Sequence, residues 1–171
     1  MTTARVAAAQ PALRPLRADD LPAVLAIQRA AYGDGYQESA AVLGRKLALA
    51  PQACWLAQSD GGVVGYVFAH PWGDAGAPPL HAPLQALPAR AAHGFVHDLA
   101  VSPAARGLGV AAALFGRVRD WSDGAGHRGM RLVALADALP FWVRQGFAVV
   151  PGALPPGYGE GACLMERAVR D

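Results

Sequence analysis

The sequence predicts an α+β domain, a mixed α/β arrangement in which about four helices flank one central, mostly antiparallel sheet. One observation is a pair of apolar runs, 53–58 and 63–70, joined by Ser-Asp-Gly-Gly, which is typical of an antiparallel hairpin. The other is a pair of apolar runs, 95–101 and 130–136, with an amphipathic helical stretch between them. Strands connected through a helix lie parallel, so the sheet should also contain one parallel pair.

Length and composition fit one domain over residues 1–171, with a flexible tail at 1–11. No apolar run approaches the ~18 residues of a membrane span and no signal peptide is recognisable, so we expect a cytoplasmic protein. The net charge of +2 and the scattered basic residues argue against a nucleic-acid partner. Cys54 and Cys163 lie in apolar runs and are expected to be reduced thiols, and the histidine spacing fits no metal site.

The chain begins with an edge strand and two helices. Residues 13–17 alternate in polarity, and Pro15 restricts this strand to an edge of the sheet. Asp19-Asp20 precede an amphipathic stretch with Pro22 in its first turn, which predicts a helix with an aspartate N-cap. A second helix is expected over 38–50, ended by a proline.

Residues 71–93, after the hairpin, are predicted to form a long proline-rich loop. A loop of this length in a compact domain is either functional or disordered. Its apolar residues Trp72, Leu80, Leu84 and Leu87 indicate that it packs against other parts of the domain.

The C-terminal part is expected to complete the sheet. The elements that follow the central helix are a strand at 130–136, a short helix at 138–144 capped by Asp137, a strand at 147–150, a flexible connection at 151–161, and a last strand at 162–169.

The most informative segment is 95–121, a strand followed by a helix with a glycine-rich start. The loop and first turn read Arg106-Gly107-Leu108-Gly109-Val110-Ala111. The glycines leave backbone N–H groups open and Arg106 adds a positive charge, so this helix start is expected to bind a phosphate-like anion. No Gly-Lys-Ser/Thr follows the glycines, which argues against a nucleoside triphosphate.

A dinucleotide is an alternative ligand for the same helix start. Gly107, Gly109 and Ala112 match G-x-G-x-x-A, and Asp137 follows the next strand, where a ribose-binding acid could lie. Against this ligand, residues 102–106 separate the strand from the glycines, and the chain beyond Asp137 is too short for a doubly wound sheet.

Two ordered motifs resemble those of the GNAT superfamily of N-acetyltransferases. The first is Leu99-x-Val101-x-Pro103-x-x-Arg106-Gly107-x-Gly109-x-Ala111-x-x-Leu114. The second is Ala138-x-x-Phe141-Trp142-x-x-x-Gly146-Phe147. The resemblance implies the GNAT fold, in which the parallel strands splay around an acyl-CoA site.

The resemblance also implies acetyl-CoA as co-substrate. Backbone N–H groups from Gly107 to Ala111, with Leu108, Gly109 and Val110 between them, would bind its pyrophosphate beside Arg106. Its pantetheine arm would lie along Leu99, Ala100 and Val101, with Phe141 and Trp142 nearby. The Leu99 N–H would polarise the thioester carbonyl as an oxyanion donor.

Proton transfer is assigned by the same resemblance. His97 occupies the position of a histidine base in related arylalkylamine N-acetyltransferases, although a structural histidine is an alternative. His97 and Asp98 are adjacent on a strand and are expected to face opposite sides of the sheet, with Asp98 serving folding or substrate binding. The family's usual tyrosine acid is replaced by Trp142, so Tyr158 or water is expected to protonate the thiolate.

The function expected from the sequence is direct transfer of acetyl from acetyl-CoA to a primary amine of a small molecule or polypeptide. Tyr32 and Tyr36, at the break between the first two helices, would wall the acceptor site. A non-catalytic acyl-CoA sensor is an alternative, motivated by Trp142. No membrane or nucleic-acid partner is expected, and a homodimer, common among relatives, is not required by any feature of the sequence.

Overall fold

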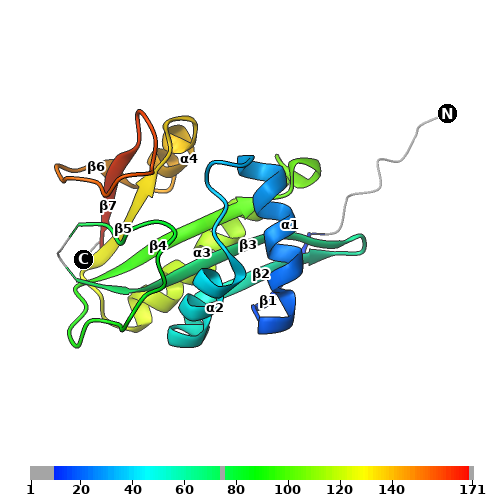
Figure 1. Ribbon diagram of the computed structural model, residues 1–171, viewed down its shortest axis with the longest axis horizontal. Helices are drawn as coiled ribbons and strands as arrows, with labels where there is room; N and C mark the ends of the chain where they lie inside the picture. Colours follow the sequence, from blue (N-terminus) through cyan, green and yellow to red (C-terminus); the bar gives the residue numbers. More distant parts are fainter. Residues whose placement is uncertain (1–9, 74–75, 170–171) are drawn as a thin grey trace.

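The structure is a computed structural model that describes residues 10–73 and 76–169. The described residues form one seven-stranded sheet in the order β1-β2-β3-β4-β5-β7-β6, antiparallel except between β4 and β5 (Figure 1). The α+β class and the single parallel pair are therefore confirmed. The strands are β1 Ala12–Pro15, β2 Cys54–Ser59, β3 Gly62–Trp72, β4 His93–Val101, β5 Gly129–Ala134, β6 Ala148–Val149 and β7 Cys163–Ala168.

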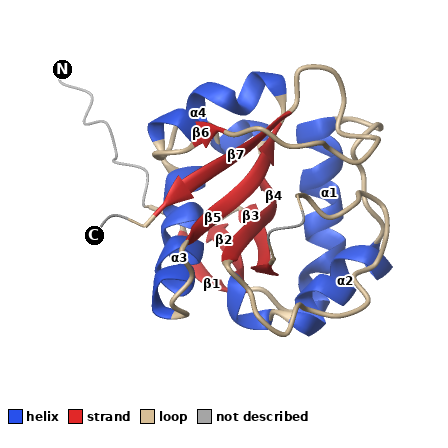
Figure 2. Cartoon of the chain, turned by 90° about the vertical axis from the view of Figure 1, so that its left-hand side faces the viewer, coloured by secondary structure: helices blue, strands red, loops and turns tan. Residues whose placement is uncertain are grey.

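Helices cover both faces of the sheet (Figure 2). The α-helices are α1 Leu21–Tyr32, α2 Ala40–Leu49, α3 Val110–Gly124 and α4 Leu139–Arg144. Alternate residues of β3 enter two separate cores: Tyr66 and Phe68 pack with α1 and α2, whereas Val67 and Ala69 pack with α3 and α4. This alternation is the two-residue period of a strand buried on both faces.

The edge position of β1 and the hairpin of β2 and β3 agree with the sequence. The C-terminal strands also form as expected, but β7 inserts antiparallel between β5 and β6. Such an arrangement is not the doubly wound parallel sheet that the dinucleotide alternative requires.

Of the two predicted aspartate caps, Asp20 does stand at the N-cap position of α1, whereas the N-cap of α4 is Ala138 and not Asp137. Asp20 makes no cap hydrogen bond to α1, because its carboxylate accepts two hydrogen bonds of 2.7 Å from Arg14 and one of 2.8 Å from the Arg17 N–H. Asp137 likewise makes no cap hydrogen bond to the turn before α4. The second helix begins later than predicted, at Ala40, with Ser39 Oγ accepting from the Val42 N–H at 3.2 Å.

The expectation that His97 and Asp98 face opposite sides of the sheet is also wrong. The β3–β4 register pairs Phe68 with Asp98 and Ala69 with Val96, which leaves His97 as an extra, bulged residue. A bulge interrupts the two-residue alternation. Both side chains therefore contact the α1–α2 side, Asp98 through Tyr32 and His97 through Glu38, which lies between α1 and α2.

The predicted loop is shorter than 71–93, because β3 extends to Trp72 and β4 starts at His93. Its described part packs as expected: Leu84 is buried, and Trp72 and Leu80 contact a small core around Tyr158. Residues 1–9, most of the predicted tail, lie outside the described residues. Among the described residues, no helix is long and apolar enough to cross a membrane.

Candidate functional site

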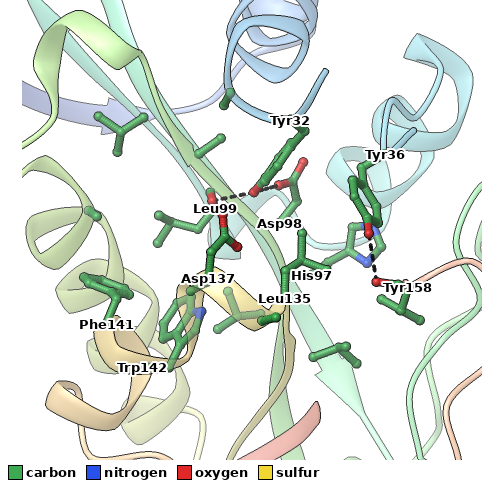
Figure 3. A pocket seen from close by; sticks show the side chains of 18 of the residues that line it. Tyr32, Tyr36, His97, Asp98, Leu99, Leu135, Asp137, Phe141, Trp142 and Tyr158 are labelled. Carbon is green, nitrogen blue, oxygen red and sulfur yellow. Dashed lines mark hydrogen bonds between the residues drawn. The ribbon is translucent and has the colours of Figure 1, made fainter. Parts of the chain in front are cut away.

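A cleft of about 750 Å³ opens where β4 and β5 part. The two strands pair only from His93 with Gly129 to Val96 with Leu132, and β4 then continues to Val101 without β5 beside it. Predicted site residues that line the cleft are Tyr32, Tyr36, His97, Asp98, Leu99, Ala100, Val101, Arg106, Ala111, Phe141, Trp142 and Tyr158. Figure 3 labels the aromatic residues among them together with His97, Asp98 and Leu99. The other four, Gly107 to Val110, lie between Arg106 and Ala111 in the chain.

The start of α3 is built to leave its N–H groups accessible. Gly107 and Gly109 have φ of 79° and 76°, a left-handed conformation that favours glycine. A Cβ added at either position would meet nothing within 4 Å, so the space in front of both is open. No side chain caps the helix, and Arg106 lines the cleft beside it. A helix start of this kind can bind an anion.

The backbone of β4 is turned toward the cleft at alternate residues. The Ser102 N–H donates to the Val64 carbonyl at 2.8 Å, and Ala100 and Asp98 share its hydrogen-bonding side in the antiparallel ladder. Leu99 and Val101 therefore direct their N–H and C=O groups away from β3, toward the space that β5 has left. The Leu99 N–H can in this way reach a ligand in the cleft.

Asp98 is held by two tyrosines. Tyr32 Oη donates to Asp98 Oδ1 at 2.9 Å and Tyr66 Oη donates to Oδ2 at 2.7 Å, and Tyr32 Oη also lies 2.7 Å from the Leu99 carbonyl oxygen. Burial raises the pKa of Asp98, against the opposing effects of His97 and the two tyrosine hydrogen bonds. Asp98 thus ties α1 to the bulged part of β4.

His97 is hydrogen-bonded to a residue that the sequence did not single out. Its Nε2 contacts Glu38 Oε1, and the two side chains are only 1% and 2% exposed. Burial alone would raise the pKa of Glu38, but the hydrogen bond and charge of His97, the charge of Lys46 and the His81 N–H lower it to about 2. Because a carboxylate only accepts, His97 Nε2 carries the shared proton, and His97 Nδ1 is buried without a hydrogen-bond partner among the described residues.

Lys46, the only lysine in the chain, lies on α2 and is fully buried. Its Nζ has no hydrogen-bond partner among the described residues. Burial lowers the pKa of Lys46, while the negative charges of Glu38 and Asp98 oppose that shift. The charge of Lys46 is therefore partly balanced by two carboxylates that line the cleft.

Trp142 is positioned by an aromatic cluster. Its ring makes edge contacts with Phe115, Phe141 and Phe147 at centroid distances of 5.6, 4.8 and 5.4 Å. The residue is buried yet still lines the cleft. It therefore forms an apolar wall on the side of α4.

Tyr158 and Tyr36 meet on the other side of the cleft. Tyr36 Oη donates to the Tyr158 carbonyl at 3.1 Å, and Tyr158 Oη donates to the Pro78 carbonyl at 2.7 Å. Burial raises the pKa of Tyr158 well above its usual value. The Tyr158 hydroxyl proton is thus directed at Pro78 in this structure.

The cysteines are both free, as expected from the sequence. Cys54 is buried in a core, and burial raises the pKa of its thiol to about 12. Among the described residues, no group of three or more His, Cys, Asp or Glu side chains could hold a metal ion.

The sequence model of the Acetyltransferase (GNAT) family matches residues 21–147, which contain every element that forms the cleft except the segment around Tyr158. The chain therefore belongs to the GNAT acetyltransferase family. Among curated proteins, none matches.

Solved structures share the fold at low sequence identity. Ard1 from Thermoplasma volcanium is 18% identical, with a TM-score of 0.74 over 95% of this chain and 99% of that one. The GNAT-like decarboxylase GphF, in complex with isobutyryl-CoA, is 22% identical, with a TM-score of 0.76 over 93% and 100%. Arabidopsis thaliana Naa50, in complex with the bisubstrate analogue CoA-Ac-MVNAL, is 16% identical, with a TM-score of 0.68 over 94% and 99%. These similarities establish the fold.

Proposed function

We propose that this protein is an acyl-CoA-dependent N-acetyltransferase that transfers acetyl directly from acetyl-CoA to a primary amine. The observation that carries the proposal is the cleft between β4 and β5, which joins an open helix start at one end to the buried His97–Glu38 pair at the other. Two structurally similar proteins hold isobutyryl-CoA or a CoA conjugate, which supports an acyl-CoA in this cleft.

In this proposal the N–H groups from Gly107 to Ala111 bind the pyrophosphate of the co-substrate, beside the Arg106 guanidinium. The helix start favours negative charge through its dipole and its free N–H groups. The outward peptide groups of Leu99 and Val101 hold the pantetheine arm, and Phe141 and Trp142 line its path.

Chemistry would take place beside the bulge. The neutral amine attacks the thioester carbon, and the Leu99 N–H stabilises the oxyanion that forms. Because the His97 ring is buried, a water molecule carries the proton released from the amine to His97 Nδ1. Glu38 accepts from the Nε2–H and so keeps Nε2 protonated. The C–S bond then breaks, and the CoA thiolate takes a proton from water, since the Tyr158 hydroxyl already donates to Pro78.

The experiment measures free thiol released from acetyl-CoA in the presence of a panel of primary amines, for the wild type and for His97→Ala. We expect release that depends on the amine and falls by about 10² or more in the variant, the usual contribution of a general base. Binding of acetyl-CoA without turnover on any amine would instead identify the acyl-CoA sensor.

A further inference from the structure

The His97 end of the cleft is lined by three segments that are far apart in the sequence, here called the enclosure. They are residues 33–39 between α1 and α2, residues 76–81 between β3 and β4, and residues 157–160 between β6 and β7. Each segment contributes to the lining, through Tyr36 and Glu38, through Leu80, and through Tyr158 and Glu160. Figure 3 shows Tyr36 and Tyr158 together on the same side of the cleft as His97.

A chain of hydrogen bonds links the three segments. Tyr36 Oη donates to the Tyr158 carbonyl at 3.1 Å, and Tyr158 Oη donates to the Pro78 carbonyl at 2.7 Å. Gly159, with φ of 87°, permits this contact, because a Cβ there would lie 2.1 Å from Tyr36 Oη. The phenol of one segment thus lies directly against the backbone of another.

Glu38 also connects two of the three segments of the enclosure. Its backbone N–H and C=O are both hydrogen-bonded to the buried Gln28 side chain, each at 3.0 Å. Its Oε2 accepts from the His81 N–H at 2.9 Å, which connects the 33–39 segment to the 76–81 segment. Arg45 on α2 adds hydrogen bonds to the carbonyls of Leu84 and Gln85 at 3.0 and 2.7 Å. The loop between β3 and β4 is therefore hydrogen-bonded both to Glu38 and to α2.

A polypeptide acceptor would need an open path past His97, because its chain continues beyond the reacting N-terminal amine. Here the Tyr36–Tyr158 and Tyr158–Pro78 hydrogen bonds join the segments that line the cleft beside His97, so we expect a polypeptide to require that these contacts open. A small amine can lie inside the enclosure, with its body against the rings of Tyr36 and Tyr158 and the side chain of Leu80. Burial of apolar surface against these groups favours an apolar or aromatic body.

We infer that the acceptor is a compact primary amine with an apolar or aromatic body, not the N-terminus of a polypeptide. This inference rests on the proposed acetyltransferase function and narrows the acceptor of that same site.

The test compares two conjugates of coenzyme A by calorimetry, one joined through acetyl to 2-phenylethylamine and one to the N-terminus of a pentapeptide. We expect the amine conjugate to bind about tenfold tighter or more than the peptide conjugate. Equal or tighter binding of the peptide conjugate, with coenzyme A itself still bound, would overturn the inference and leave the co-substrate site intact. Failure of coenzyme A and both conjugates to bind would overturn the proposed function and the inference together.

A variant gives a second test that depends on the enclosure alone. Tyr36→Ala removes both the ring and the hydrogen bond to Tyr158, and should reduce the difference between the two conjugates by improving peptide binding. Affinity for free coenzyme A should stay within about twofold of the wild type, since Arg106 and the start of α3 are unchanged, and this shows that the variant folds. An unchanged ratio between the conjugates would contradict the proposed enclosure.

Discussion

His97 Nε2 and Glu38 Oε1 form a hydrogen bond that is almost completely buried, between a bulged strand residue and the segment that leads into α2. In the proposed reaction, Glu38 orients the ring and fixes which nitrogen carries a proton. Partners of this kind act through the base and do not touch the substrate.

Glu38→Gln should lower kcat/KM by about 10² or more, because an amide can no longer stabilise a protonated His97 and can hold the wrong tautomer. The effect should fall on kcat, and the acid limb of the pH–rate profile should move. Steady-state kinetics across pH on a reactive amine would measure both.

The matched control is Glu160→Gln, which neutralises a second carboxylate that lines the same cleft. No hydrogen bond joins the Glu160 side chain to His97, so its loss should leave the kcat profile unshifted. Equal losses in the two variants would mean that Glu38 acts only through the general charge of the cleft.

The free energy of unfolding should depend on pH through Glu38. The folded pKa of about 2 lies below the ordinary value of 4.5, so the contribution is fully present above about pH 4.5 and is lost as pH falls toward 2. A difference of this size corresponds to about 3 kcal/mol. Urea denaturation at a series of pH values should show a smaller loss on acidification for Glu38→Gln than for the wild type, and parallel curves would contradict the assignment.

The charged form of Lys46 should lower the free energy of unfolding. Its folded pKa is lowered mainly by burial, so the unfolded chain binds more protons near the ordinary pKa of 10.5, and stability should rise as pH increases toward that value. Lys46→Met keeps the length of the side chain and removes the charge. We expect the variant to be more stable than the wild type by about 1 kcal/mol at pH 7, with the difference shrinking as the pH rises.

Lys46→Arg is the control for that substitution, since a guanidinium is larger and stays charged. It should destabilise the protein at every pH. If Lys46→Met proves less stable than the wild type at pH 7, the attraction of Glu38 and Asp98 outweighs the desolvation of the amine, and the sign of this prediction is wrong.

The sequence predicts the elements of this fold well because hydrophobic periodicity and turn residues are local signals. The β2–β3 hairpin, the parallel β4–β5 pair and the glycine-rich start of α3 all follow from such signals. The positions of His97 and Asp98 do not, because a bulge depends on the register with the neighbouring strand. One inserted residue is enough to bring two adjacent side chains to the same side.

Glu38 and Lys46 were missed for a related reason. Charged residues at and within a predicted helix are normally exposed. Both are buried because α2 packs on β3 next to the bulge, which is a tertiary relationship. A signal that could have been used for Lys46, the only lysine in the chain, is that apolar Val42, Leu43 and Leu49 lie three or four residues away along the helix, on the same face.

The start of α3 is the anion site of the proposed co-substrate. Gly109→Ala forces a side chain into a left-handed conformation, at a cost of about 1 kcal/mol, and places a methyl group where a pyrophosphate would approach. Affinity for coenzyme A should fall about tenfold or more, measured by calorimetry. The control is Gly116→Ala in the middle of the same helix, where an added Cβ meets only the Arg119 side chain at 4.0 Å. That variant should gain about 0.5–1 kcal/mol of stability with unchanged affinity, and equal affinities of the two variants would place the anion elsewhere.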